Sequence, residues 1–146
     1  MIKMTFTVRP DQGDASDFDL GDITCEGENG SVGSAGHTPD QGMMIYLSVP
    51  LLLDSLRPLL TGERKAAGFV GTDSSFRLDF TRDRKGFVSV SAKGTVVGKS
   101  TPAELADAVL QAVRELDERS LSALPAGSGA RSDLRSSTER FRAAVA

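Results

Sequence analysis

Apolar and polar residues alternate most regularly at the start of the chain. Ile2, Met4, Phe6 and Val8 alternate with Lys3, Thr5, Thr7 and Arg9. This period of two predicts a half-buried strand over residues 2–9, which Pro10 ends. A second strand is predicted at residues 22–28, with Ile23 and Cys25 turned inward.

Two segments in the first third of the chain have few large apolar residues. Residues 11–21 are rich in Asp, Gly and Ser, which is typical of a loop. Between residues 27 and 42, Val32 is the only large apolar residue among many glycines. This second segment fits either a mobile loop or a short strand around residues 31–35.

A long apolar run follows in the middle of the chain. Residues 43–49 are apolar at six of seven positions, which predicts a central strand covered on both faces. Pro50 suits the first position of a helix, and Gly62 suits the residue after its end. The predicted helix at residues 50–61 has an apolar face made of Leu52, Leu53, Leu56, Leu59 and Leu60.

The clearest hairpin and the clearest helix come next. Residues 75–81 and 87–93 alternate around a charged turn, which predicts two antiparallel strands with one wet face. Thr101 and Glu104 form a capping box at the start of a helix predicted at residues 101–119. Its apolar stripe consists of Leu105, Val109, Ala112, Val113 and Leu116. Because consecutive elements are usually neighbours, we expect this stripe to pack on the hairpin.

Together these elements predict an α+β fold with a mainly antiparallel sheet of five to seven strands and two helices packed on it. We expect one domain over residues 1–124 and a flexible linker at residues 125–132. Residues 133–146 predict a helical tail with a thin apolar stripe.

Composition and charge narrow the classes of function. The chain has 39% hydrophobic and 25% charged residues, no Trp and a net charge of −3. From Pro10 to Leu56 it has no Lys or Arg, and the late basic residues are interrupted by acidic ones. These features argue against nucleic acid as a partner. We expect no membrane segment, and the single Cys25 favours a reducing, cytoplasmic location.

The stretch Gly98-Lys99-Ser100-Thr101 is the candidate binding site. It resembles part of a P-loop, but only three residues separate Gly94 from Gly98 where a P-loop needs four. The structural alternative is a turn that leads into the helix. The functional alternative is an anion held at the helix N-terminus with Lys99 beside it.

Other reactive residues lack partners in the sequence. His37 is the only histidine and lies in a Gly-rich segment, whereas catalytic triads are held by rigid elements. Starting a calcium loop at Asp17 puts Gly21 one place too early. Cys25 has no basic neighbour that would activate its thiol. The sequence therefore predicts no catalytic residue, no metal site and no cofactor.

The element order carries one resemblance. Residues 86–90 (Gly-Phe-Val-Ser-Val) lead to residues 105–110 (Leu-Ala-Asp-Ala-Val-Leu) after a Leu-rich helix and a strand meander. Over about residues 20–120 the pattern resembles small single-domain bacterial proteins of uncharacterised, immunity-protein-like families. The resemblance implies a non-enzymatic protein that binds a partner protein, often one encoded nearby, and it transfers no site residues.

Two hypotheses about function follow. The first is a non-catalytic protein-binding module, acting on a partner protein or as a dimer, with the acidic 11–40 region or the basic tail as its contact surface. The second is a small-molecule or anion binder, or an enzyme, with its site at Gly98–Thr101.

Overall fold

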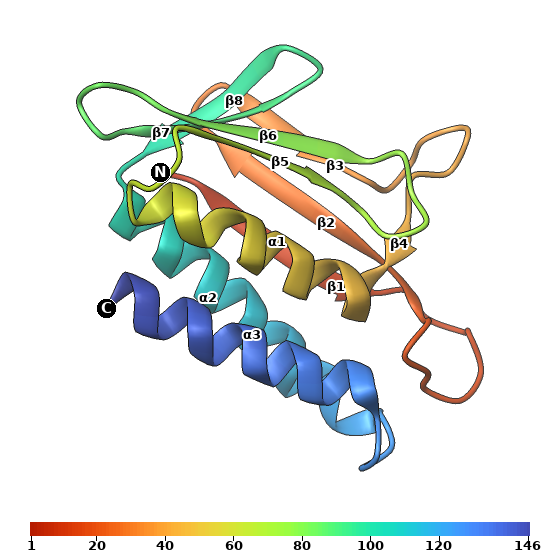
Figure 1. The fold of residues 1–146 in the computed structure, drawn as a ribbon. Helices are drawn as coiled ribbons and strands as arrows, with labels where there is room; N and C mark the ends of the chain where they lie inside the picture. Colours follow the sequence, from red (N-terminus) through yellow and green to blue (C-terminus); the bar gives the residue numbers. More distant parts are fainter.

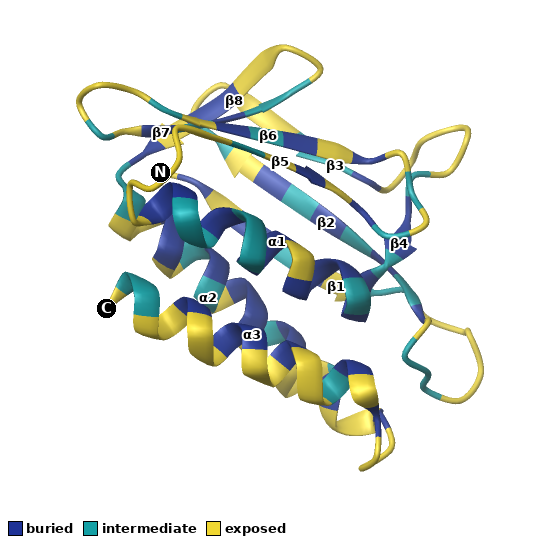
Figure 2. Cartoon of the chain, in the orientation of Figure 1, coloured by how far each residue is buried: buried dark blue, intermediate teal, exposed yellow.

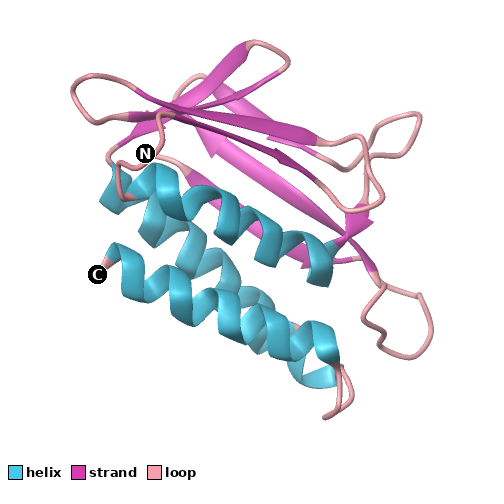
Figure 3. Ribbon diagram, in the orientation of Figure 1, coloured by secondary structure: helices cyan, strands magenta, loops and turns pink.

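The computed structural model describes residues 1–146 and confirms the α+β class. It contains two four-stranded antiparallel sheets and three α-helices. The helices α1 and α2 lie next to the strands, and α3 lies on the side of α1 that faces away from them (Figures 1 and 3). The strands are β1 (Lys3–Val8), β2 (Leu20–Gly27), β3 (Gly30–Gly33), β4 (Met43–Met44), β5 (Ala66–Val70), β6 (Arg77–Arg82), β7 (Val88–Ala92) and β8 (Thr95–Ser100). The helices are α1 (Ile45–Leu60), α2 (Pro102–Arg119) and α3 (Gly129–Val145), with a short 3₁₀ turn at Leu121–Ala123.

The first sheet is built around β2. This strand pairs with β1 along one side and with β3 and β4 along the other, all antiparallel. The predicted alternation is confirmed in β1, where Met4 and Phe6 are buried while Lys3 is exposed. Of the two alternatives for the Gly-rich segment, the structure has a short strand, β3.

The second sheet is a meander in sequence order, β5-β6-β7-β8. The predicted hairpin is confirmed as β6 and β7, with Phe80 opposite Val90. Both of these side chains are fully buried, as is Leu78 on the same face of β6. Alternation therefore identified β1, β2, β6 and β7 correctly, and these strands belong to two different sheets.

The helix α1 corrects the prediction for residues 43–61. Only Met43 and Met44 are extended, and the helix begins at Ile45, so Pro50 lies inside it and not at its first position. Ten of the sixteen α1 residues are buried, because the sheets cover one side and α3 the other (Figure 2). An apolar run this continuous looks the same for a buried strand and for a helix packed on two sides.

The helix α2 has the predicted capping box and apolar stripe. The hydroxyl of Thr101 accepts from the Glu104 N–H at 3.1 Å, and the Glu104 carboxylate accepts from the Thr101 N–H at 3.1 Å. Its expected position on the β6–β7 hairpin is wrong, because α2 packs mainly along β1 of the first sheet. The inner face of the second sheet is covered by α1, which packs against β5.

The helix α3 begins at Gly129, four residues before the predicted tail helix. The Ser128 hydroxyl caps it by accepting from the Arg131 N–H at 3.1 Å. It packs against α1 and buries Leu134 and Phe141, while its outer side is exposed (Figure 2). The division into a 1–124 domain with a separate tail stays a prediction.

The two sheets meet where Gly27, at the end of β2, crosses Gly98 in β8. A Cβ added to Gly27 would lie 2.5 Å from the Val97 carbonyl oxygen and 2.7 Å from the Gly98 Cα.

We expect Gly27→Ala to lower the free energy of unfolding by about 1–3 kcal/mol, because backbone atoms must move to make room. Urea unfolding would measure it. Gly127→Ala is the control, since a Cβ there meets nothing within 4 Å, and equal losses in both variants would contradict the prediction.

Candidate functional site

A cleft of about 530 Å³ lies between β3 and the second sheet, and we call it the β3 cleft. One wall comes from β3 and the loop that precedes β4, and the other comes from β6, β7 and β8. Its apolar lining consists of Val32, Phe76, Ala92 and Val97. Phe76 and Val97 are buried, so the interior of the cleft is apolar and its rim is polar.

The strand β3 has an unpaired edge in this region. It pairs only with β2, and the Ser34 N–H continues that ladder by donating to the Ile23 carbonyl at 3.0 Å. Hydrogen-bonded and non-hydrogen-bonded positions alternate along an antiparallel pair. The backbone groups of Ser31 and Gly33 therefore point away from β2, where a further strand could bond to them.

His37 covers one of these backbone groups. Its Nε2 lies 2.7 Å from the Gly33 carbonyl oxygen. Because a carbonyl can only accept, Nε2 carries the proton in this bond. The imidazole thus caps the end of the β3 edge and leaves the Ser31 groups and the Gly33 N–H open.

The charged side chains on the rim of the cleft differ in whether they form an ion pair. The Arg77 guanidinium donates to the Asp79 carboxylate at 2.8 Å, and these hydrogen bonds raise the pKa of Arg77. Lys93 occupies the β7–β8 turn with a positive φ of 52° and makes no ion pair. The charge left unpaired at the rim is therefore positive.

The loop that carries His37 is fixed by Arg9. The guanidinium binds the Asp22 carboxylate at 2.9 and 3.0 Å and the Asp40 carboxylate at 2.7 and 2.8 Å. Asp22 also accepts from the buried Ser34 hydroxyl at 2.7 Å. The hydrogen bonds from Arg9 hold the pKa of both carboxyls below the usual range. Arg9, which directly follows β1 and lies outside the cleft, thus positions one wall of the cleft.

The acidic segment as a whole is largely occupied by contacts within the chain. Asp17 accepts from the Ser128 hydroxyl and the Ala130 N–H, so it lies at the N-terminus of α3, where a negative charge is favourable. Asp19 accepts from the Ser16 N–H at 3.1 Å. No three His, Cys, Asp or Glu side chains in residues 1–146 gather as metal ligands would. These acidic groups hold elements of the fold together.

The four residues predicted as an anion site lie at the end of β8 and the start of α2. The Lys99 ammonium is 3.0 Å from the Asp83 carboxylate and 5.2 Å from the centre of the Phe87 ring. At the start of α2, the Glu104 carboxylate already accepts from both the N–H and the hydroxyl of Thr101. The Glu28 carboxylate also accepts from the Lys99 N–H at 3.3 Å, so an anion here would have to compete with three carboxylates for the same donors.

The anion site stays a prediction, and inorganic phosphate tests it directly. Binding would raise the melting temperature with phosphate concentration and would protect the backbone N–H groups of the first α2 turn. The same titration with Lys99→Met should then show a smaller rise. No shift in the wild-type protein, with chloride at matched ionic strength as the control, would contradict the site.

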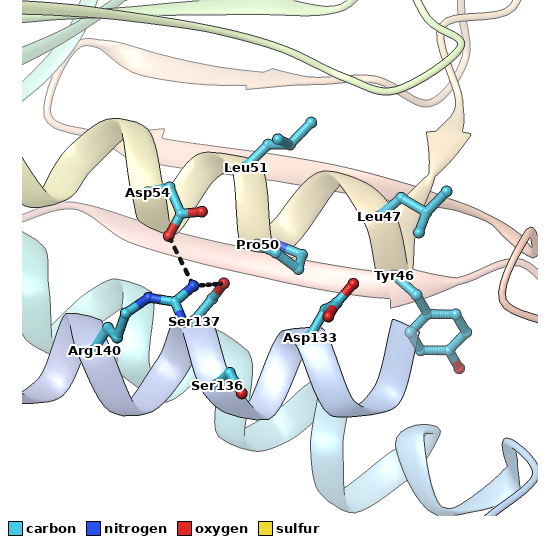
Figure 4. A pocket seen from close by; sticks show the side chains of 9 residues that line it. All are labelled: Tyr46, Leu47, Pro50, Leu51, Asp54, Asp133, Ser136, Ser137 and Arg140. Carbon is cyan, nitrogen blue, oxygen red and sulfur yellow. Dashed lines mark hydrogen bonds and ion pairs between the residues drawn. The ribbon is translucent and has the colours of Figure 1, made fainter. Parts of the chain in front are cut away.

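A second groove, of about 350 Å³, runs between α1 and α3 (Figure 4). Arg140 lies across it, 3.8 Å from the Asp54 carboxylate and 3.1 Å from the Ser137 hydroxyl. Tyr46 is buried at one end, and its hydroxyl donates to the Ser120 carbonyl at 3.3 Å. Of these contacts, only the Arg140–Asp54 pair joins α3 to α1.

Cys25 is fully buried in β2, and burial raises the pKa of its thiol to about 12. The thiolate, which is the reactive form, is therefore scarce near neutral pH.

None of the three α-helices is long and apolar enough to cross a membrane.

Comparisons of the chain with protein-family models, with curated proteins and with solved structures gave no match. The fold and the site define an α+β protein with an open apolar cleft beside an unpaired strand edge. The resemblance to immunity-protein-like families stays a prediction.

Proposed function

We propose that the protein is a non-catalytic protein-binding module and that the β3 cleft binds an extended segment of its partner. The observation that carries this proposal is the unpaired edge of β3 in the wall of an apolar cleft. A strand added to an open edge gains main-chain hydrogen bonds, and neighbouring pockets then select its alternate side chains.

The groups that line the cleft indicate which backbone bonds and side chains the bound segment would have. The N–H groups of Ser31 and Gly33 and the Ser31 carbonyl are the edge groups that remain for it, because His37 takes the Gly33 carbonyl. Apolar side chains of the segment would contact Val32 and Val97. An acidic side chain would face Lys93, the cation without an ion pair at the rim.

The proposal also fits the state of the polar side chains. Arg77 is bound to Asp79, and the Nε2–H of His37 donates to a backbone carbonyl, so both side chains already serve contacts within the chain. This arrangement favours recognition over bond-making chemistry.

Site-specific photocrosslinking in cells of the source organism tests the proposal. A photoreactive residue at Thr95, on the rim of the cleft, should capture one defined segment of a partner, whereas the same residue at the exposed Glu118 of α2 should not. A synthetic peptide of the captured segment should then bind the purified protein and shift the amide signals of Ser31 and Gly33.

Two substitutions in β7 separate cleft binding from other effects. Ala92→Arg fills the cleft and should abolish peptide binding, while Ser89→Arg adds the same side chain to the same strand outside the cleft lining and should leave binding intact. Equal capture from Thr95 and Glu118, or peptide binding that survives Ala92→Arg, would overturn the proposal.

A further inference from the structure

The strand β5 forms a second open edge, at the far side of the second sheet from β8. The ladder with β6 is framed by hydrogen bonds from the Arg82 N–H to the Lys65 carbonyl, at 2.8 Å, and from the Gly71 N–H to the Phe76 carbonyl, at 3.0 Å. Odd-numbered residues therefore bond to β6, and the backbone groups of Ala66, Gly68 and Val70 point outward. We call these three residues the β5 edge.

The β5 edge lacks the features that usually prevent strand addition. Such edges are normally protected by charged residues, by proline or by a covering element, and β5 has the sequence Ala-Ala-Gly-Phe-Val. The edge of β8, by contrast, is covered by Asn29, whose N–H donates to the Val97 carbonyl at 2.9 Å. The edge of β1 carries Lys3, and His37 caps part of β3. The β5 edge thus has no charge or cap of its own, although the Arg77 guanidinium of β6 lies over Gly68.

The surroundings of the β5 edge have room for a strand. A groove of about 310 Å³ lies between the edge and α1, lined by residues that include Ser55, Pro58 and Gly68. Leu51 projects from α1 on the side turned away from α3 (Figure 4) and is 49% exposed, and Val70 is 45% exposed. Figure 1 shows α1 running below β5, with no element on the outer side of the strand. Leu51 and Val70 lie outside the lining of this groove, so its own apolar surface comes from small residues of β5.

We propose that the β5 edge pairs with the β5 edge of a second copy of this chain, antiparallel and about a two-fold axis at Gly68. This register places Gly68 opposite its own copy and Ala66 opposite Val70, so the outward groups form about six main-chain hydrogen bonds. All three side chains are small or apolar, and none clashes with itself across the axis. The pairing joins the two four-stranded sheets into one continuous sheet, with the interface identical from both sides.

The charges next to β5 agree with this orientation. Glu63, Arg64 and Lys65 before the strand carry one net positive charge, and residues 71–73 after it carry the negative charge of Asp73. Antiparallel pairing brings the basic end of each copy to the acidic end of the other. A parallel arrangement would place like charges together, which lowers affinity.

Sedimentation velocity across a concentration series tests the proposal, together with hydrogen exchange. The wild-type protein should shift from 15.4 kDa to twice that mass in the micromolar range. In the dimer, the amides of Ala66, Gly68 and Val70 should gain protection that is lost on dilution. A chain that stays monomeric at hundreds of micromolar overturns the proposal, even if another protein pairs with this edge.

A matched pair of substitutions locates the interface. Val70→Lys places a charge on the β5 edge and should weaken dimerisation at least tenfold, while Val96→Lys makes the same change at a 42% exposed valine of β8 and should leave it unchanged. Melting temperatures check that both variants fold, and Ala66→Pro, which removes only an outward N–H, serves as a second edge variant. Dimerisation that survives both edge variants overturns the proposal.

Discussion

Replacing Phe141 with alanine is expected to lower the free energy of unfolding by about 3–5 kcal/mol. Phe141 comes from the last helix but is fully buried, as part of the main apolar core. Truncating a buried phenylalanine removes apolar contacts and leaves a cavity that the surroundings fill only in part. A loss of this size is a large fraction of the stability of an ordinary domain. Equilibrium urea unfolding followed by circular dichroism would measure it.

The neighbouring residue provides the control for this prediction. Arg142 is exposed on the same helical turn, and Arg142→Ala should change the free energy of unfolding by less than about 0.5 kcal/mol. The comparison also tests the predicted division at residue 124. If residues 133–146 were a separate tail, Phe141→Ala would leave the unfolding of the remaining chain at its wild-type value, as Arg142→Ala does.

Local alternation predicted β1, β2, β6 and β7 because each of them has one buried and one solvent-facing side. In β6, Leu78 and Phe80 are buried while Arg77 and Thr81 are exposed, so the period of two is visible in the sequence. The cap of α2 was equally visible, because Thr101 and Glu104 satisfy backbone groups within the first turn. Both signals depend on residues that lie close together in the chain.

The start of α1 could not be predicted in the same way. Its residues are apolar on nearly all sides, because the sheets and α3 both cover it. The periodicity of apolar residues then does not distinguish a helix from a strand, and the prediction placed the start of the helix too late, at Pro50. The signal that could have corrected this is length, since the stretch from Met43 to Leu53, interrupted only by Ser48 and Pro50, is longer than most strands.

Contacts between distant segments were also beyond the sequence pattern. The packing of α2 on β1 joins residues 102–119 to residues 3–8, and the rule that consecutive elements are neighbours gave the wrong partner. The β3 cleft depends on such contacts as well, since its walls come from residues 31–41 and 75–97. The one sequence signal for its support was Arg9, the cation that directly precedes a long segment without Lys or Arg.

Replacing Arg9 with methionine is expected to lower the free energy of unfolding by about 1–3 kcal/mol and to loosen the loop that carries His37. Arg9 and Asp22 are partly buried, with 28% and 13% of their side chains exposed, so the substitution leaves the Asp22 carboxylate without its main partner. The amide signals of residues 35–42 should broaden or shift, because Arg9 also holds Asp40. Arg77→Met is the matched control, since the Arg77–Asp79 pair is more exposed and should contribute little.

The effect of Arg9→Met should also depend on pH, with a sign fixed by the lowered pKa of Asp22. A carboxyl whose pKa is lower in the folded than in the unfolded state stabilises the fold fully above its unfolded pKa of about 4. That contribution disappears as the pH falls through the lower, folded value. Since Arg9 is the first cause of the lowered pKa of Asp22, the stability difference between wild type and Arg9→Met should be largest near neutral pH and should shrink below about pH 4. Urea unfolding over a pH series would measure this, and a difference that stays constant or grows in acid would show that Arg9 stabilises the fold through packing and not through its carboxylate partners.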